Sequence, residues 1–238
     1  MQATPDSFRA LARSSPWRWR TLHATFTDER GVVEAWVRRP GELRVRRDGE
    51  PDYYASGVPH TTSVRTVGRG PVPVRPKRPL PHEVAPLLQP DGLVAERPAD
   101  PFIVYDDPMY RNYQWVAMLD PVELSRHVAV DDVRSADLAG REVWWARLRP
   151  EEDYSPRCGC CALLWSEISA RNEYGDQPDL LTRFAAEGYP SATDVALDLQ
   201  TGVVVRLEPI GGRARPFRLL IHEVDADVDA VFAGVGPR

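Results

Sequence analysis

The sequence contains little cysteine, almost no lysine and no long apolar run. Three cysteines among 238 residues are too few for a disulfide framework, and they favour a reducing compartment. The longest unbroken apolar run, residues 160–165, is far shorter than the ~20 residues of a membrane-spanning helix, so we expect no transmembrane segment. Residues 1–20 carry several charges and no apolar stretch, which is unlike a signal peptide. We therefore expect a cytoplasmic protein as written, or an exported one if the true start lies upstream.

Motifs for catalysis and for nucleic-acid binding are also missing. The sequence holds no nucleophile elbow, phosphate-binding loop or dinucleotide fingerprint, and its five histidines lack the spacing of a metal-binding motif. Of the 30 basic residues only Lys77 is a lysine. This bias is more typical of a GC-rich, actinobacterial-like genome than of selection for binding a particular ligand. The isoelectric point of about 5.6 argues against a nucleic-acid partner. We expect a protein that is not an enzyme and has no cofactor.

What the sequence does contain is a series of alternating strands. Apolar and polar residues alternate over 21–27, 33–37 and 43–46, and the connection Arg39-Pro40-Gly41-Glu42 is typical of a type II turn. Further strands are predicted at 61–67, 128–133, 141–149, 160–168, 193–199, 203–208 and 217–224. Helices are predicted at 5–14, 107–119 and 180–187. Because strands and helices do not alternate regularly, the pattern indicates an α+β fold built on an antiparallel sheet.

A proline-rich stretch from 68 to 101 interrupts this pattern. Proline donates no ladder hydrogen bond and fixes φ, so we interpret the stretch as an extended surface loop and not as sheet. The loop belongs to one domain, residues 1–238, in this interpretation. An interdomain linker is the alternative.

Two patterns near the ends of the chain carry a further signal. The first is Leu22-His23-Ala24-Thr25-Phe26-Thr27, then Gly31, then Glu34-Ala35-Trp36-Val37-Arg38-Arg39-Pro40. The second is Asp198 with Thr201-Gly202, followed by the closing strand from Phe217 to Asp227. Together they resemble the LolA-like lipoprotein carriers, a superfamily that includes the sigma-E regulatory proteins and mycobacterial lipid-binding lipoproteins. The resemblance implies a curved antiparallel sheet, a half-open β-barrel, with a few helices as a lid over an apolar cavity.

The resemblance also implies roles for individual residues. Arg39 stands where carriers place an arginine that holds the lid through hydrogen bonds to backbone carbonyls, and Trp36 matches a tryptophan just before it. A solvated turn arginine and an ordinary core tryptophan are the alternatives. With the aromatic residues of the predicted lid and sheet, the ligand-binding candidates are Trp36, Arg39, Tyr110, Tyr113, Trp115 and Trp145.

Cys158-Gly159-Cys160-Cys161 is the most unusual local motif. Zinc sites usually have four ligands in two pairs, whereas this cluster offers three thiols, and His127 or His222 could complete a site only if the fold brings it there. Neighbouring thiols can also form a disulfide. In the third interpretation Cys161 packs in the core while Cys158 lies in a loop.

Two functions from different classes are consistent with these patterns. The first is a non-catalytic protein that binds an apolar or lipid-like small molecule beneath the helix at 107–119, with Arg39 as the latch of the lid. The second is a regulatory or protein-interaction module with a filled core, whose protein partner contacts the basic hairpin at Arg38, Arg44, Arg46 and Arg47. An open apolar cavity would distinguish the first from the second.

Overall fold

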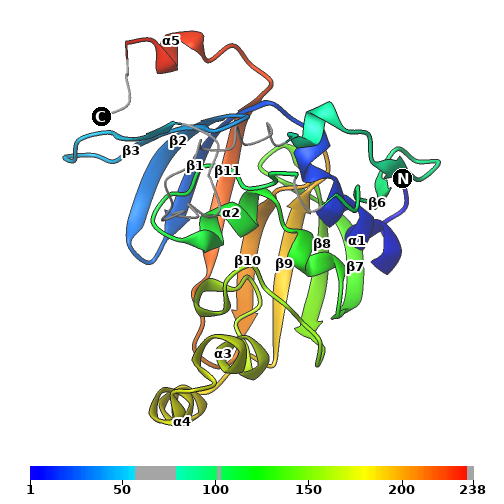
Figure 1. Cartoon of the computed structure of the whole chain (residues 1–238), viewed down its shortest axis with the longest axis vertical. Coiled ribbons are helices and arrows are strands. Elements are labelled where there is room, and N and C mark those ends of the chain that lie inside the picture. The colour runs from blue at the N-terminus through cyan, green and yellow to red at the C-terminus, as the bar shows by residue number, and fades with distance from the viewer. Residues whose placement is uncertain (57–78, 101–102, 235–238) are drawn as a thin grey trace, which may run out of the picture.

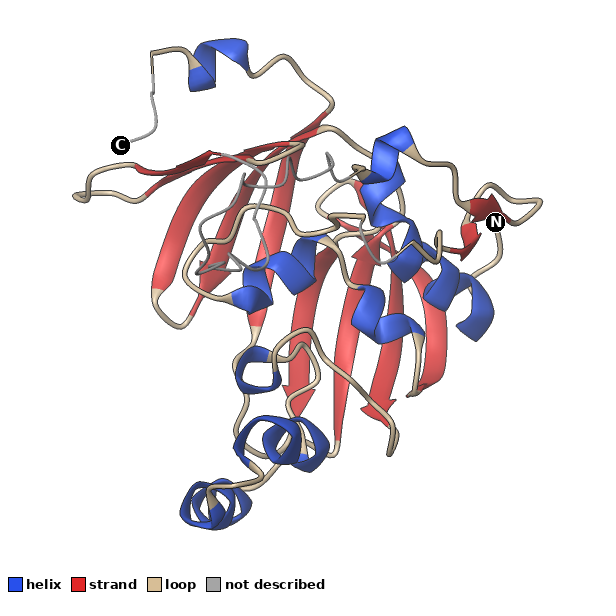
Figure 2. Cartoon of the chain, viewed as in Figure 1, coloured by secondary structure: helices blue, strands red, loops and turns tan. Residues whose placement is uncertain are grey.

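The computed structural model describes residues 1–56, 79–100 and 103–234 (Figure 1). The strand predicted at 61–67 and part of the proline-rich stretch lie outside the described residues. The rest of the chain builds one large sheet with helices packed mainly on one face (Figure 2).

The sheet contains nine strands in the order β4-β3-β2-β1-β11-β10-β9-β8-β7, and it is not closed. All neighbouring strands run antiparallel. The strands are β1 (Thr21–Asp28), β2 (Gly31–Arg38), β3 (Glu42–Arg46), β4 (Tyr53–Ser56), β7 (Val128–Leu138), β8 (Arg141–Pro150), β9 (Ala192–Asp198), β10 (Val204–Ile210) and β11 (Phe217–Val224). The predicted α+β class and its curved antiparallel sheet are thus confirmed (Figure 1).

The two ends of the chain meet in the interior of the sheet. The first strand pairs with the last one, with Leu22 opposite Val224 and Phe26 opposite Leu219. This pairing joins two antiparallel meanders, β1–β4 and β7–β11, into one sheet. The motif-bearing ends of the sequence are therefore neighbours in space.

Two helices cover the inner face of the sheet (Figure 1). Helix α1 (Pro5–Ser14) begins where the Thr4 hydroxyl accepts a hydrogen bond from the Ser7 amide at 3.2 Å, which caps its first turn. Its Phe8 and Leu11 are fully buried in the main core. Helix α2 (Tyr113–Leu119) starts at an Asn112 cap. The side chains between these helices and the sheet form the principal hydrophobic core.

The remaining helices lie at the margins of the sheet. Helices α3 (Glu167–Tyr174) and α4 (Pro178–Glu187) lie beyond one end of β9 and β10, and α4 ends at Gly188, as predicted (Figure 1). The short α5 (Asp229–Phe232) follows the last strand and packs on the outer face, in a second small apolar cluster.

Three predicted elements are wrong in extent or type. Part of the proline-rich stretch forms a small two-stranded sheet, β5 (Leu87–Leu88) with β6 (Val94–Glu96), which binds α1 through the Val94 amide and the Ser14 hydroxyl at 2.9 Å. The helix predicted from 107 begins only at Tyr113, because Arg111 has a φ of 66° that breaks helical geometry.

The strand predicted at 160–168 does not exist. Residues Gly159–Cys161 form a 3-10 turn, and the Ser166 side chain then caps α3 by accepting from the Ser169 amide at 3.2 Å. The unbroken apolar run in this segment is an irregular connection whose Ala162, Leu163 and Leu164 are buried in the main core, and not a pleated strand.

Candidate functional site

The interior beneath α2 is filled with aromatic side chains. Trp115 makes an edge-on contact with Phe26, with ring centroids 5.4 Å apart, and another with Tyr110 at 5.5 Å. The space beside these rings measures about 30 Å³, room for about one water molecule. This space is too small for an acyl chain, whereas the larger groove described below is lined in part by Asn112 and Gln114 at the start of α2. Trp115 and Tyr110 are buried packing residues, whereas Tyr113 is 39% exposed.

Two of the predicted binding residues lie on the opposite face of the sheet from this interior. Trp36 alternates with the core residues Ala35 and Val37, so it points outward, where it packs with Phe232 of the C-terminal segment. Trp145 likewise lies opposite the buried Trp144, and its ring is 5.6 Å from the guanidinium of Arg134. The prediction that these two tryptophans contact the same ligand as α2 is wrong, because the pleat separates them from it.

Arg39 lies at the junction of α1, α2 and the segment that precedes α2. Its guanidinium forms a two-pronged ion pair with Asp107, at 2.8 and 2.6 Å, and donates to the carbonyl oxygen of Ser15 at 2.7 Å. A longer contact of 3.4 Å reaches the carbonyl of Leu119, the last residue of α2. The guanidinium also lies 3.4 Å from the ring centroid of Trp19. Arg39 thus joins the end of α2 to α1 and is not a solvated turn residue.

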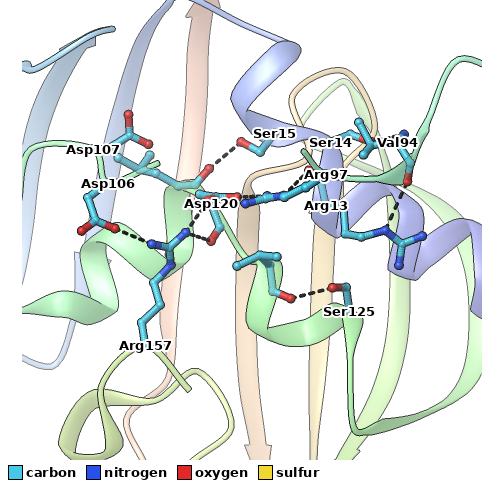
Figure 3. Close-up of polar contacts among 12 residues, drawn as sticks. Arg13, Ser14, Ser15, Val94, Arg97, Asp106, Asp107, Asp120, Ser125 and Arg157 are labelled. Atoms are coloured by element: carbon cyan, nitrogen blue, oxygen red, sulfur yellow. Dashed lines mark hydrogen bonds and ion pairs between the residues drawn. The ribbon is translucent and has the colours of Figure 1, made fainter. Parts of the chain in front are cut away.

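A second buried charge cluster, which interacts electrostatically with Arg39, comprises Arg97, Asp106, Asp120 and Arg157 (Figure 3). Asp120 is fully buried and pairs with both Arg97, at 3.0 Å, and Arg157. Arg157 also pairs with Asp106. Burial alone would raise the pKa of Asp120, but the charges of Arg97 and Arg157 outweigh it and hold that pKa below its ordinary value. The network ties together segments that are far apart in the sequence.

Glu123 forms a third buried polar site behind this network. Its carboxylate accepts hydrogen bonds from the Tyr154 hydroxyl at 2.7 Å and from the amides of Leu163 and Arg157, at 2.9 and 3.1 Å. Burial raises the pKa of Glu123. Because its oxygens accept bonds from the protein itself, Glu123 holds the 154–163 connection in place and is not directed at an open site.

An open groove lies at the end of the sheet where α3 and α4 pack. Its volume is about 350 Å³, within the range of small-molecule sites. Its apolar wall comprises Ala162, Leu163, Trp165, Tyr174, Phe184 and Leu207. The Trp165 and Phe184 rings meet edge-on at 5.2 Å, and Tyr174 lies 5.3 Å from Phe184. None of the residues of α4 is fully buried, so the apolar face of this helix is only half covered.

Charged side chains surround the rim of this groove. Three arginines line it, Arg183, Arg213 and Arg215, against the two carboxylates of Glu29 and Glu187. Glu187 pairs with Arg183 at 3.0 Å and with Arg213 at 3.3 Å, while Arg215 pairs with Glu29 at 3.0 Å. The rim therefore carries one more positive than negative charge.

Sequence reasoning missed the groove because its walls come from separate parts of the chain. The amphipathic pattern of α4 was the only available local signal, since Leu181 and Phe184 lie on one helical face. The opposing wall, from β10 and the connection after it, is brought to α4 only by the sheet order. The three cysteines also come together here, and Cys160 and Cys161 line the groove.

The arginines of the basic hairpin are occupied by contacts within the chain. Arg38 pairs with Glu42 and Asp229, both at 2.5 Å, and Arg44 pairs with Asp52 at 2.6 Å. Arg46 reaches Glu34 at 3.5 Å, and Arg47 reaches Glu50 at 3.2 Å. The hairpin is thus a locally neutralised surface.

The fold and the groove define an α+β protein with an open antiparallel sheet and a partly apolar surface site. No protein-family model matches the sequence, and no curated protein matches it. Among solved structures, the chain is similar to the crystal structure of LprF from Mycobacterium bovis, with 11% sequence identity and a TM-score of 0.35 over 96% of this chain and 97% of that one. Across the described residues, no helix has the length and apolar character needed to cross a membrane.

Proposed function

We propose that the chain is a non-catalytic binding protein that holds an amphipathic small molecule, an apolar chain with an acidic head, in the groove between α4 and the sheet. The observation that carries this proposal is the half-buried aromatic wall, in which Trp165 and Phe184 meet edge-on below a rim of three arginines. The ligand is of the lipid-like class predicted from the sequence, and the groove proposed for it extends from α4 to Asn112 and Gln114 at the start of α2.

The energetics of such a ligand follow from the composition of the groove. Each methylene removed from water contributes about 0.8 kcal/mol, so a short alkyl chain against Trp165 and Phe184 suffices for measurable binding. A carboxylate or phosphate at the rim would meet Arg213, whose side chain is 71% exposed and shares Glu187 with Arg183. The positive excess at the rim favours an acidic head over an uncharged one.

The direct test is displacement of an environment-sensitive fluorescent fatty acid from the full chain by decanoate, with decanol as the uncharged comparison. We expect decanoate to compete and decanol to compete more weakly. Phe184→Asp removes an apolar contact worth about 1.5–3 kcal/mol and should weaken decanoate binding by about tenfold or more. Ala185→Asp, on the exposed side of the same helix, adds the same charge outside the groove and should bind as the wild type does.

The proposal fails if the fluorescent probe does not bind, or if Phe184→Asp and Ala185→Asp bind decanoate equally. The filled interior beneath α2 favours a second candidate, the protein-interaction module. Absence of binding to either amphiphile would support that candidate. Its contact surface would then have to lie outside the neutralised hairpin arginines.

A further inference from the structure

The three cysteines of this chain lie together in one turn. Cys158 precedes the 3-10 turn Gly159–Cys161, and the Cys161 amide donates to the Cys158 carbonyl at 3.4 Å. As a result all three sulfur atoms lie within 4.8 Å of one another. The Sγ atoms of Cys158 and Cys160 are 3.0 Å apart, and those of Cys160 and Cys161 are 3.9 Å apart. All three are free thiols.

The turn is held rigidly against α3. A Cβ atom at Gly159 would lie 2.7 Å from both the Ser169 carbonyl oxygen and the Glu173 Cβ. Only glycine therefore lets the backbone approach the helix this closely. The arrangement of the sulfurs is built into the packing of the turn and does not depend on a ligand to form it.

The spacing of the sulfurs fits a single metal ion. Zinc–sulfur bonds of about 2.3 Å at tetrahedral angles put neighbouring sulfurs about 3.8 Å apart. This separation lies between the observed distances of 3.0 and 3.9 Å, and all three sulfurs are within 4.8 Å of one another. Small side-chain rotations that move each sulfur by a fraction of an ångström would make the sulfur–sulfur separations equal. In the part of the chain that the structure describes, this is the one group of three or more potential metal-binding side chains whose ligand atoms converge.

The electrostatics around the cluster also favour a cation. The groups of α3 that face it are the Glu173 carboxylate and the Tyr174 phenol, neither of them positive. A metal ion would replace three thiol protons, which pass to solvent, and would offset part of the negative charge of the three thiolates that form.

We propose that Cys158, Cys160 and Cys161 form a three-thiolate site for a thiophilic metal ion of the Zn(II) or Cu(I) class. Thiolate sulfur selects these soft ions over Mg(II) or Ca(II). Cys160 is exposed, so a fourth position remains accessible to water or to an external ligand. Cys160 and Cys161 also line the groove, so the metal site adjoins the place proposed for the amphiphile. Metal titration of protein without added amphiphile tests the metal site separately.

The test uses the reduced, metal-free full chain and Co(II) as a spectroscopic probe. We expect one equivalent of Co(II) to give thiolate-to-metal charge-transfer absorption, and Zn(II) to displace it. Separate competition against chromophoric Zn(II) and Cu(I) chelators then decides which of the two ions binds more tightly. Cys158→Ser, Cys160→Ser and Cys161→Ser should each weaken binding by on the order of 100-fold or more, as the loss of supporting groups alone costs up to that much.

Ser155→Ala, an exposed change in the same connection, is the matched control and should bind as the wild type does. Circular dichroism of each variant checks that the fold is retained, and the wild-type charge-transfer intensity counts the thiolates without any substitution. The proposal is overturned if the reduced wild type binds none of the three ions. It is equally overturned if any single serine variant keeps wild-type affinity, or if two cysteines pair in a disulfide and the protein binds no metal after reduction.

Discussion

Replacement of Arg39 by methionine should destabilise the fold by about 3–5 kcal/mol, because it leaves the carboxylate of Asp107 buried without its partner. The side chains of Arg39 and Asp107 are only 8% and 5% exposed, so water cannot take over the lost hydrogen bonds. The variant also loses the bond from Arg39 to the Ser15 carbonyl at 2.7 Å and the stacking on Trp19.

Two further variants separate the charge of Arg39 from its geometry. Arg39→Lys keeps the positive charge but cannot form the two-pronged pair, so its cost should be about 1.5–3 kcal/mol, that of losing a hydrogen bond to a charged group. The double variant Arg39→Met with Asp107→Asn removes both charges. It should be less destabilised than the sum of its single variants, by about 0.5–3 kcal/mol.

The assay is urea unfolding followed by tryptophan fluorescence, with the free energy of unfolding extrapolated to water. The m-value should be unchanged among the five proteins, which are the wild type, Arg39→Met, Arg39→Lys, Asp107→Asn and the double variant; this would show that the unfolded states are comparable. A cost below about 1 kcal/mol for Arg39→Met, within the range of exposed ion pairs, would refute the reasoning. Equal costs for Arg39→Lys and Arg39→Met would show that the positive charge contributes nothing without the fork geometry, and an Arg39→Lys variant as stable as the wild type would show that the fork geometry contributes nothing.

Two more predictions concern a buried acid and a glycine. Because the pKa of Asp120 lies below its ordinary value in the folded state, its contribution is present at neutral pH and is lost as the pH falls through that depressed pKa, below about 3.9. The stability difference between wild type and Asp120→Asn, from urea unfolding across pH, should therefore shrink at acid pH, and a constant difference would contradict this. Gly212→Ala should cost more than about 2 kcal/mol in thermal unfolding, since its Cβ would meet the Tyr189 backbone at 2.3 Å. Gly211→Ala, with a similar φ and open space, is the control, and equal losses would exclude the steric cause.

Strands and helix ends could be predicted from the sequence because their signals are local. The alternation over 21–27 and 217–224 gives β1 and β11, Thr4 caps α1, and Gly188 ends α4 in a positive-φ conformation. Each of these signals depends on residues within a few positions of one another. The strand expected at 160–168 was wrong because an unbroken apolar run does not distinguish a strand from a buried irregular connection, and the Ser166 cap then begins a helix.

The candidate sites depend on contacts that no local pattern encodes. Asp120 meets Arg97 and Arg157 from distant segments, and the groove forms only when β10 lies beside α4. The alternation predicts that Trp36 and Val37 point to opposite faces of the sheet. Only the folded structure shows that Phe232 of the C-terminal segment packs against Trp36. Long-range pairing, and not residue type, therefore decided which predicted residues come together.

The central claim is that the groove binds an amphipathic small molecule. Native mass spectrometry tests this claim most directly, with protein purified from the cells that naturally produce it. The account predicts a non-covalent excess mass of a few hundred daltons that disappears on denaturation, is extracted as an acidic amphiphile, and is absent from the Phe184→Asp variant. Equal native and denatured masses for the wild type would contradict the claim, as would an excess mass that Phe184→Asp retains in full.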